Sequence, residues 1–205
     1  MSVEIQKVYI DTPHRKQILQ AVDILKNGGV IVYPTDTIYG LAADLNQKKA
    51  IEKILKIKHS NKHKLLSFIF PDLKQIGDWA NISNSTFRLI KRVLPGKYTF
   101  IFPASKSVPR AILHKRQTIG IRVPDCVVSR CITLEMGMPI LSASVPKGEN
   151  DYFTDPAEIA DMFRSELDLI LDCGIRPNEP SSIIDFSVEP PIIIREGAGD
   201  LSFFE

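Results

Sequence analysis

The stretch VIVYPTDTIYGLAADL, residues 30–45, begins as an apolar run and changes character at Pro34. Because the run is apolar at every position, it is typical of a strand that helices cover on both faces. Thr35 and Thr37 follow at its carboxyl end, where α/β folds usually bind ligands. Two interpretations of this polar part stay open: a ligand-binding turn, or a cap by Asp36 or Thr37 on a short helix through IYGLAADL.

The chain around this stretch has the composition of an ordinary globular domain. Of its 205 residues, 44% are hydrophobic and 24% are charged, which argues against disorder. No linker-like composition divides it, so we expect a single domain over residues 1–205, with its core at about 14–200. The stretch MSVEIQKVYIDTPHRK has no apolar segment behind a basic one, so we do not expect it to act as a signal peptide, and no apolar run reaches the roughly 20 residues of a membrane helix. We therefore expect a cytoplasmic protein with no membrane partner.

Cysteine and histidine patterns give no metal or disulfide signal. The three cysteines, Cys126, Cys131 and Cys173, lack CxxC spacing, which predicts reduced thiols. His59 and His63 are four residues apart without an HExxH motif or a third ligand nearby, so a solvated pair is the better interpretation. We expect no structural metal.

Apolar periodicity predicts an α/β domain with a twisted, mixed parallel and antiparallel sheet flanked by helices. A linker of only five residues, SVEPP, separates the strands SSIIDF and PIIIRE, so this pair must be antiparallel. Thr12 and Pro13 are placed to begin the first helix. The expected helices are 12–27, 47–58, 72–80, 83–94, 126–136 and 155–164. The expected strands are 30–33, 65–70, 98–103, 118–123, 139–143, 168–171, 182–187 and 191–195.

The usual nucleotide and hydrolase motifs are missing. Gly96-Lys97 is followed by Tyr98 where a P-loop needs Ser or Thr, and GAGDLS at 197–202 leaves no room for the helix of a dinucleotide fold. There is also no GxSxG nucleophile motif. What remains is a set of cations and hydroxyls at strand ends, which suits phosphate and zwitterion binding without covalent catalysis.

Basic residues gather in the segment KILKIKHSNKHK, residues 53–64. Lys56 and Lys58 are two apart, so they converge on one polyphosphate only if the helix stops between them. A solvated lysine face is the alternative for this segment.

Two arginines each follow an apolar strand. Arg122 and Arg195 are costly to bury unpaired, so each should pair with an acid such as Asp125 or Glu196, or face a site that holds an anion. Serines also stand at strand ends, where such residues are often turn formers. They are Ser142, Ser144, Ser181 and Ser182.

Together these segments resemble the YrdC-like family, which includes the threonylcarbamoyl-AMP synthases of a tRNA modification. YPTDTIYGL is close to the family's most distinctive segment, and IGIRVPD, ILSAS, PSSIIDF and IIIREGAG follow in the family's order. The chain departs from the lysine-any-arginine motif at Lys58, and from the serine-any-asparagine motif at Ser144. The C-terminal SSIIDF and REGAGDLSFF are more similar to the YciO-like branch.

The resemblance implies a basic concave cavity that binds ATP with Mg²⁺, L-threonine and bicarbonate. It implies a nucleotidyltransferase that makes L-threonylcarbamoyladenylate and pyrophosphate. By this match Lys56 and Lys58 are the catalytic, phosphate-binding pair, and Thr35, Thr37 and Arg122 bind the substrate. The implied nucleotide-binding residues are Ser142, Ser144, Ser181 and Arg195.

Two other functions stay open. The altered motifs are compatible with hydrolysis of a threonylcarbamoyl adenylate or a related carbamoyl compound. The basic segment and cavity are compatible with binding of tRNA or double-stranded RNA, although Trp79 is the only tryptophan and few aromatic residues are placed for base stacking.

Overall fold

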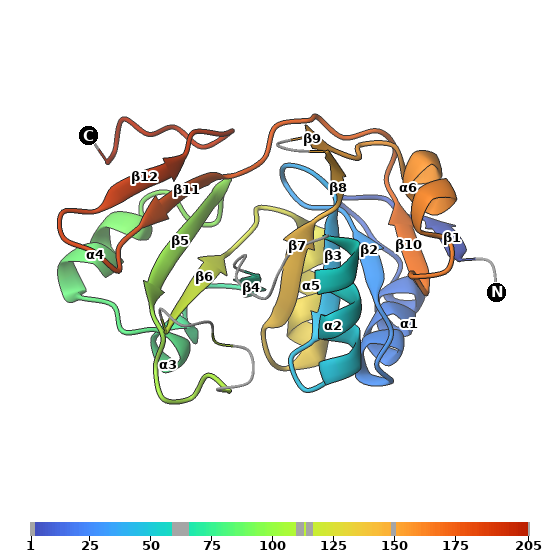
Figure 1. The fold of residues 1–205 in the computed structure, drawn as a ribbon, viewed down its shortest axis with the longest axis horizontal. Coiled ribbons are helices and arrows are strands. Elements are labelled where there is room, and N and C mark those ends of the chain that lie inside the picture. Colours follow the sequence, from blue (N-terminus) through green and yellow to red (C-terminus); the bar gives the residue numbers. More distant parts are fainter. Residues whose placement is uncertain (1–2, 59–65, 110–112, 114–116, 149–150, 205) are drawn as a thin grey trace.

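A ten-stranded mixed sheet runs the length of the molecule (Figure 1). A computed structural model of the chain describes residues 3–58, 66–109, 113, 117–148 and 151–204. The strand order is β1-β10-β2-β3-β7-β4-β6-β5-β11-β12, and a separate pair, β8 and β9, forms a small hairpin. The sheet mixes parallel and antiparallel neighbours, so the expected fold class is confirmed.

The strands take the apolar segments that the sequence indicated, with additions. β11 and β12 are antiparallel, as their short linker required. The strands are β1 (Glu4–Lys7), β2 (Ile31–Tyr33), β3 (Gly40–Asp44), β4 (Ser67–Ile69), β5 (Tyr98–Pro103), β6 (Thr118–Arg122), β7 (Ile140–Ser144), β8 (Pro146–Gly148), β9 (Asp151–Tyr152), β10 (Leu169–Asp172), β11 (Ser182–Asp185) and β12 (Ile192–Arg195).

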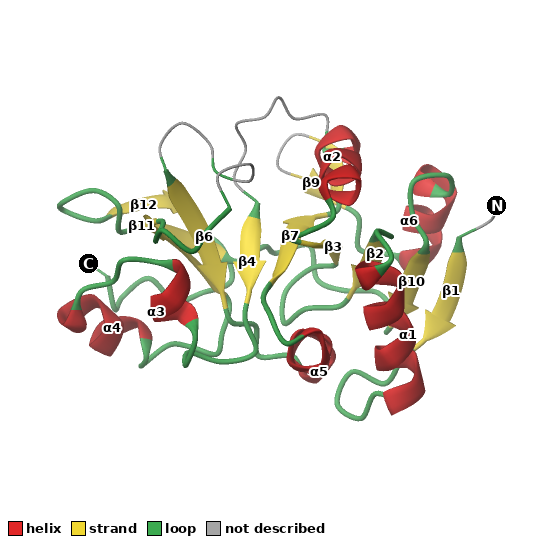
Figure 2. Cartoon of the chain, turned by 90° about the horizontal axis from the view of Figure 1, so that it is seen from below, coloured by secondary structure: helices red, strands yellow, loops and turns green. Residues whose placement is uncertain are grey.

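The helices bury the two faces of the sheet. The helices are α1 (Arg15–Lys26), α2 (Lys48–Ile57), α3 (Ile76–Trp79), α4 (Asn84–Ile90), α5 (Val127–Met136) and α6 (Pro156–Phe163). Ile31 and Tyr33 of β2 pack in one core cluster with α1 and α5, and Val32 packs in a second with α2 and α6. Figure 2 shows α2 and α5 on opposite sides of β3 and β7. The prediction that helices cover both faces of this strand is therefore confirmed.

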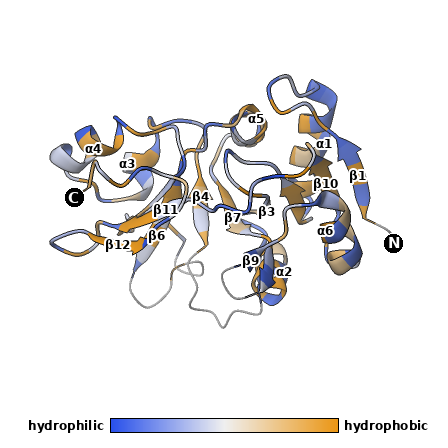
Figure 3. Cartoon of the chain, turned by 90° about the horizontal axis from the view of Figure 1, so that it is seen from above, coloured by the Kyte–Doolittle hydropathy of each residue, from blue (hydrophilic) through white to orange (hydrophobic). Residues whose placement is uncertain are grey.

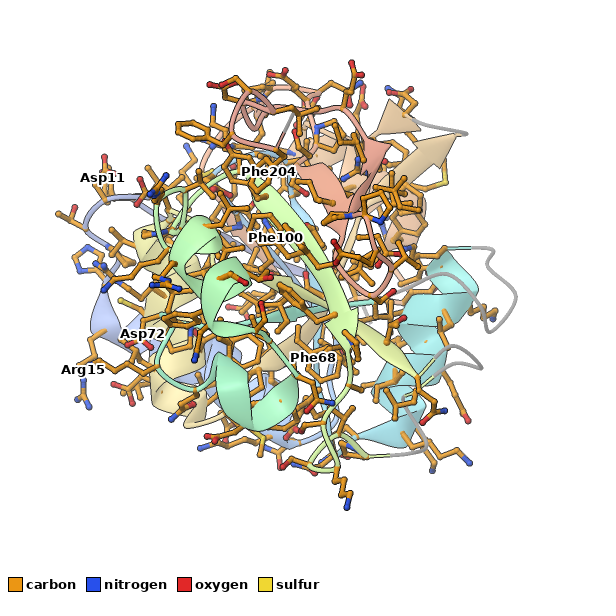
Figure 4. The ribbon with its side chains drawn as sticks, turned by 90° about the vertical axis from the view of Figure 1, so that its left-hand side faces the viewer. Asp11, Arg15, Phe68, Asp72, Phe100 and Phe204 are labelled. Atoms are coloured by element: carbon orange, nitrogen blue, oxygen red, sulfur yellow. The ribbon has the colours of Figure 1, made fainter. Side chains whose placement is uncertain are left out.

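A third cluster, rich in aromatic rings, fills the other half of the sheet. Phe68, Phe100 and Phe102 are almost fully buried, and α3 and α4 add Ile76 and Ile90 to this cluster. Near the C-terminus, Phe204 packs on Phe100 with ring centroids 5.6 Å apart (Figure 4). This cluster holds the last residues of the chain against β5.

Several local expectations were wrong. The segment IYGLAADL contains strand β3 and not a helix, so neither Asp36 nor Thr37 caps a helix there. Its Gly40 faces the Tyr33 ring so closely that an added Cβ would lie 2.9 Å from a ring carbon. The first helix begins at Arg15 after His14, not at Thr12. The helix expected over 72–80 is only the four-residue α3.

The two ends of the sheet differ in polarity, and the chain crosses between its halves. Figure 3 shows β12 in the hydrophobic colour at one end and β1 in the hydrophilic colour at the other. In Figure 1 the chain leaves β10 near the N-terminal end and runs along one side of the molecule to β11. This crossover, residues 173–181, passes the turn that follows β2, because Arg176 bonds to Thr35 there.

Candidate functional site

A buried ion pair forms the centre of the site. Arg122, the last residue of β6, donates through Nη2 to Asp36 Oδ1 at 2.5 Å, and the two side chains are only 9% and 6% exposed. The other oxygen of Asp36 accepts the backbone N–H of Asp125 at 3.1 Å. An acid does pair with Arg122, but the predicted candidate Asp125 was wrong. The carboxylate comes instead from the turn after β2.

The turn Thr35–Thr37 is held in shape by its own hydroxyls. Thr35 Oγ1 donates to the carbonyl oxygen of Ile38 at 2.6 Å and accepts the backbone N–H of Thr37 at 3.2 Å. Arg122 Nη2 also donates to Thr37 Oγ1 at 2.6 Å and to Thr35 Oγ1 at 3.2 Å. The three residues predicted to bind substrate, Thr35, Thr37 and Arg122, therefore lie in one hydrogen-bond network.

A second cluster forms around Arg195 at the end of β12. Its guanidinium donates to the carbonyl oxygen of Ser181 at 2.7 and 3.0 Å, and to the Tyr152 hydroxyl at 3.0 Å. Ser181 Oγ lies 3.3 Å from Arg195 Nη2 and 2.8 Å from Thr99 Oγ1. Ser181 and Arg195, both predicted to bind nucleotide, are thus in contact. Among the described residues, no carboxylate lies within ion-pair distance of Arg195.

The two arginine clusters lie close enough for their charges to interact. Burial lowers the pKa of the Arg195 guanidinium, the Tyr152 hydroxyl raises it, and the positive charge of Arg122 lowers it further. Only one carboxylate, Asp36, contacts this pair of guanidiniums within the described part of the chain. These two guanidiniums therefore have only one carboxylate in contact with them, and an anion would relieve the repulsion between them.

Ser142 and Ser144 have different environments although they are neighbours on one face of β7. Ser142 is buried; its hydroxyl donates to the carbonyl oxygen of Leu41 and accepts from the Tyr33 phenol, each at 2.9 Å. Burial raises the pKa of the Tyr33 phenol. The one proton of Ser142 is thus already used inside the protein. Ser144 is half-buried, and no described residue bonds to its hydroxyl.

The basic pair lies at the end of α2. This helix ends at Ile57, so Lys56 is in its last turn and Lys58 is the residue that follows. The stop between the two lysines, on which their convergence depends, is therefore present. Lys56 is exposed and Lys58 is half-buried. The rest of the basic segment, from His59 to Lys64, lies outside the described residues.

Sequence reasoning missed three contributors to these contacts. Asp36 was considered only as a helix cap, although an acid beside two threonines at a strand end is a visible signal. Arg176 donates to the carbonyl oxygen of Thr35 at 3.0 Å, and Tyr152 contacts Arg195 from the β8–β9 hairpin. Neither residue belongs to a recognisable motif, so only the three-dimensional structure could place them.

Over the described ranges, no three His, Cys, Asp or Glu side chains gather in a way that could hold a metal ion. No helix within those ranges is both long and apolar enough to span a bilayer.

The chain is similar in sequence to a known protein family and to several of its members. The Sua5/YciO/YrdC family model, described as "Telomere recombination", matches residues 23–197. An uncharacterised protein of Haemophilus influenzae is 38% identical over 200 residues, covering 96% of this chain and 97% of the relative. A threonylcarbamoyl-AMP synthase of Vibrio vulnificus is 31% identical over 183 residues, covering 87% of this chain and 97% of that enzyme.

Solved structures agree with the fold. The crystal structure of Escherichia coli YciO matches with a TM-score of 0.95 at 36% identity, over 99% of this chain and 100% of that one. Sua5 of P. abyssi in complex with L-threonine matches with a TM-score of 0.86 at 26% identity. That match covers 94% of this chain but 57% of the Sua5 chain, which is longer.

Proposed function

The chain belongs to the Sua5/YciO/YrdC family, and from that premise we propose that it makes L-threonylcarbamoyladenylate. The substrates are ATP, L-threonine and bicarbonate, pyrophosphate is the second product, and the adenylate serves tRNA threonylcarbamoyladenosine modification. The synthase-named relatives and the threonine complex of P. abyssi Sua5 support an enzyme of this kind. The proposal also includes a basic concave cavity that holds these substrates.

The observation that carries the proposal is the excess of positive charge around the Thr35–Thr37 turn. Arg122 is buried and Arg195 is half-buried, and Asp36 is the only carboxylate in ion-pair contact with either among the described residues. A partly buried guanidinium without a countercharge is costly, so the arrangement favours anionic ligands. ATP and N-carboxythreonine are both anions.

In the proposed reaction, the protein holds two anions in line and needs no nucleophile of its own. L-Threonine and bicarbonate first give N-carboxythreonine and water. An oxygen of its N-carboxyl (carbamate) group then attacks the α-phosphate of ATP; a new P–O bond forms, and pyrophosphate leaves with the electrons of the P–O bond that breaks. Arg122 with Thr35 and Thr37 would hold the threonine part. Arg195, Ser181 and Ser144 would contact the nucleotide. Lys56 and Lys58 would neutralise the phosphates, with Mg²⁺ bound to ATP as part of the substrate.

A direct assay tests this function. The purified protein is incubated with ATP, Mg²⁺, L-threonine and bicarbonate, and pyrophosphate and the acyl adenylate are measured together. We expect both products in equal amounts, and neither when threonine or bicarbonate is omitted. Pyrophosphate released without threonine would show a different ATP reaction and would contradict the proposal.

The two motif departures offer a sharper test of reaction direction. Lys58 keeps the charge of the family's arginine but loses its bidentate fork, and Ser144 lacks the amide of asparagine. Since Ser142 is bonded internally, Ser144 is the member of this motif whose hydroxyl has no described partner. We therefore expect Lys58→Arg with Ser144→Asn to raise adenylate synthesis about tenfold, the effect of roughly 1.4 kcal/mol in the transition state.

The departures also keep hydrolysis as a second candidate function. Suppose that neither the wild type nor the double variant makes adenylate, while the wild type consumes added threonylcarbamoyl adenylate. The synthase proposal then fails and hydrolysis replaces it. The control is Lys91→Arg, a matched change at an exposed position on α4's C-terminal side, which should leave either activity unchanged.

A further inference from the structure

The Ser182 hydroxyl, at the start of β11, holds the chain segment that follows β12. This side chain is fully buried. Its oxygen accepts the backbone N–H groups of Gly197 and Gly199, each at 3.1 Å, and it donates to the carbonyl oxygen of Gly199 at 2.7 Å. A serine hydroxyl offers one proton and two lone pairs, so the backbone uses all three. Ser182 is therefore saturated by its own chain and has no bond left for a ligand.

The segment after β12 also packs tightly on the residues just before β11. An added Cβ at Gly197 would lie 2.3 Å from the carbonyl oxygen of Pro180 and 2.8 Å from that of Ser181. The N–H of Ala198 donates to the Pro180 carbonyl at 2.8 Å. Only glycine fits at position 197 without a shift of the backbone, so the chain after β12 keeps a fixed separation from the chain before β11.

Two residues predicted to bind nucleotide flank this contact. Ser181 directly precedes Ser182, and Arg195 lies two residues before Gly197. The guanidinium of Arg195 donates to the Ser181 carbonyl from Nη2 at 2.7 Å and from Nε at 3.0 Å. The distance between Ser181 and Arg195 therefore depends on the backbone segments that the Ser182 hydroxyl joins.

The pairing of β11 with β12 does not by itself fix Arg195. Arg195 pairs with Ile183, but the register shifts between Ile183 and Ile184. Such a shift interrupts the regular ladder of hydrogen bonds between two strands. On the C-terminal side of this irregularity, the Ser182 hydroxyl supplies three hydrogen bonds between the two segments. These bonds continue the connection where the strand pairing ends.

We propose that Ser182 is a positioning residue of the nucleotide site: its hydroxyl fixes the backbone after β12 and thereby sets the position of the Arg195 guanidinium. The inference rests on the proposed function for the identity of the ligand, ATP. It assigns Ser182 no contact with that ligand. The two neighbouring serines thus differ in role, since Ser181 contacts Arg195 directly and Ser182 acts through the backbone.

Calorimetry with ATP and Mg²⁺ tests the inference on two variants. Ser182→Ala leaves the N–H groups of Gly197 and Gly199 without their acceptor, and Gly197→Ala forces the same segment away from the start of β11. Because Arg195 keeps its charge but loses its exact position, we expect Ser182→Ala to weaken ATP binding about three- to tenfold. We expect a similar loss in Gly197→Ala, and an unchanged affinity for L-threonine in both variants.

Two matched controls separate positioning from a general loss of stability. Ser187→Ala removes a serine hydroxyl that donates to Asp185, at the other end of β11, at 2.6 Å. Gly77→Ala adds a methyl group at a glycine where an added Cβ meets nothing within 4 Å. Urea midpoints are measured for all variants, and ATP affinity should stay unchanged in both controls even where the midpoint falls.

The outcomes decide the role of the hydroxyl. Loss of ATP affinity in Ser182→Ala, with or without a loss in Gly197→Ala, supports the proposal. Wild-type affinity in Ser182→Ala, or an equal loss in Ser187→Ala, would overturn it. A loss in Gly197→Ala alone would mean that packing places Arg195 without the hydroxyl, which also overturns it. If Ser182→Ala does not fold, Ser182→Cys takes its place, because a thiol is a weaker hydrogen-bond partner.

A measurement without ATP keeps this inference apart from the proposed function. The Nε–H of Arg195 is bonded to the Ser181 carbonyl, so NMR can follow its exchange with water. We expect exchange about threefold faster or more in Ser182→Ala than in the wild type and the controls, because the bond opens more often. If exchange is faster but the wild type binds no ATP, the nucleotide assignment fails and the positioning role stands. If the wild type binds ATP and exchange is unchanged in Ser182→Ala, the positioning role fails and the nucleotide assignment stands.

Discussion

Arg122 and Arg195 occupy equivalent positions in the sequence pattern, but only one of the two has a countercharge in the structure. Each is the last residue of its strand. Arg122 is paired with the buried carboxylate of Asp36, whereas Arg195 is bonded to a carbonyl and two hydroxyls that carry no charge. Removing the carboxylate from a buried arginine leaves an uncompensated charge and destabilises the fold, while an arginine with only neutral acceptors keeps its charge available for a ligand.

From this comparison we expect the largest loss of stability when Asp36 is replaced. In Asp36→Ala, Arg122 keeps its charge in a buried position with only the hydroxyls of Thr35 and Thr37 as acceptors and no countercharge, and the N–H of Asp125 loses its acceptor as well. We expect the free energy of unfolding to fall by about 3–5 kcal/mol, the usual cost of breaking a buried pair. Urea denaturation followed by circular dichroism measures this change.

A surface ion pair provides the matched control. Asp161 pairs with Arg164 at 2.9 Å, but the two side chains are 76% and 63% exposed. Asp161→Ala should therefore cost at most about 0.5 kcal/mol. Equal losses in the two variants would mean that burial does not distinguish Asp36, and the contrast between the arginines would lose its basis.

At Arg195 the expected effect is on ligand affinity more than on stability. Arg195→Gln removes the charge but leaves a side chain that can still bond to the Ser181 carbonyl. We expect ATP affinity to fall about 10- to 100-fold, since a hydrogen bond to a charged group contributes about 1.5–3 kcal/mol. Isothermal calorimetry with ATP and Mg²⁺ gives the affinity, and the urea midpoint should move little.

The matched change Arg164→Gln, on the exposed end of α6, should alter neither quantity. If Arg195→Gln unfolds the protein as readily as Asp36→Ala does, Arg195 is a structural residue like Arg122. The two sites would then no longer differ in role.

The smallest effect is expected for Tyr152→Phe. This change removes only the hydroxyl that contacts Arg195 at 3.0 Å, at a half-buried position that water can reach. Since water can replace that hydroxyl, we expect a stability loss of about 0.5–1.5 kcal/mol at most. Measuring urea midpoints for this variant and Asp36→Ala side by side shows whether neutral and charged partners differ as proposed; a larger loss for Tyr152→Phe would reverse the ranking.

The sequence predicted most of the fold because apolar runs and their spacing are local signals. The strand through Ile31–Tyr33 and the antiparallel pair near the C-terminus were visible in this way. β3 was not, because Gly40 and three alanine or leucine residues fit a helix as well as a strand. In the structure this segment pairs with β2 on one side and β7 on the other, and Gly40 fits closely against Tyr33 and Ser142 there. The exposed strand β1 was also missed, since it is polar and pairs only with the distant β10.

The sequence indicated some residues of the site, but it indicated neither their pairings nor the contributions of Asp36, Arg176 and Tyr152. Residues at strand ends stood out by type, and the structure brings Thr35, Thr37 and Arg122 together, and Ser181 with Arg195. The pairing of acids with arginines depends on the order of the strands in the sheet. That order could not be predicted from the sequence. The inward bond of Ser142 likewise depends on Tyr33, more than a hundred residues away.

The position of β10 has a consequence for the way this protein is made. β10, Leu169–Asp172, lies between β1 and β2, so the first strand to leave the ribosome has no described neighbour until nearly the whole chain has been synthesised. The crossover that follows β10 leads to β11, which pairs with β5 in the other half of the sheet. Both halves of the sheet are therefore completed only after the segment from β10 to β11 has been synthesised. Until then, the nascent chain must keep the open edge of β2 from pairing with other chains.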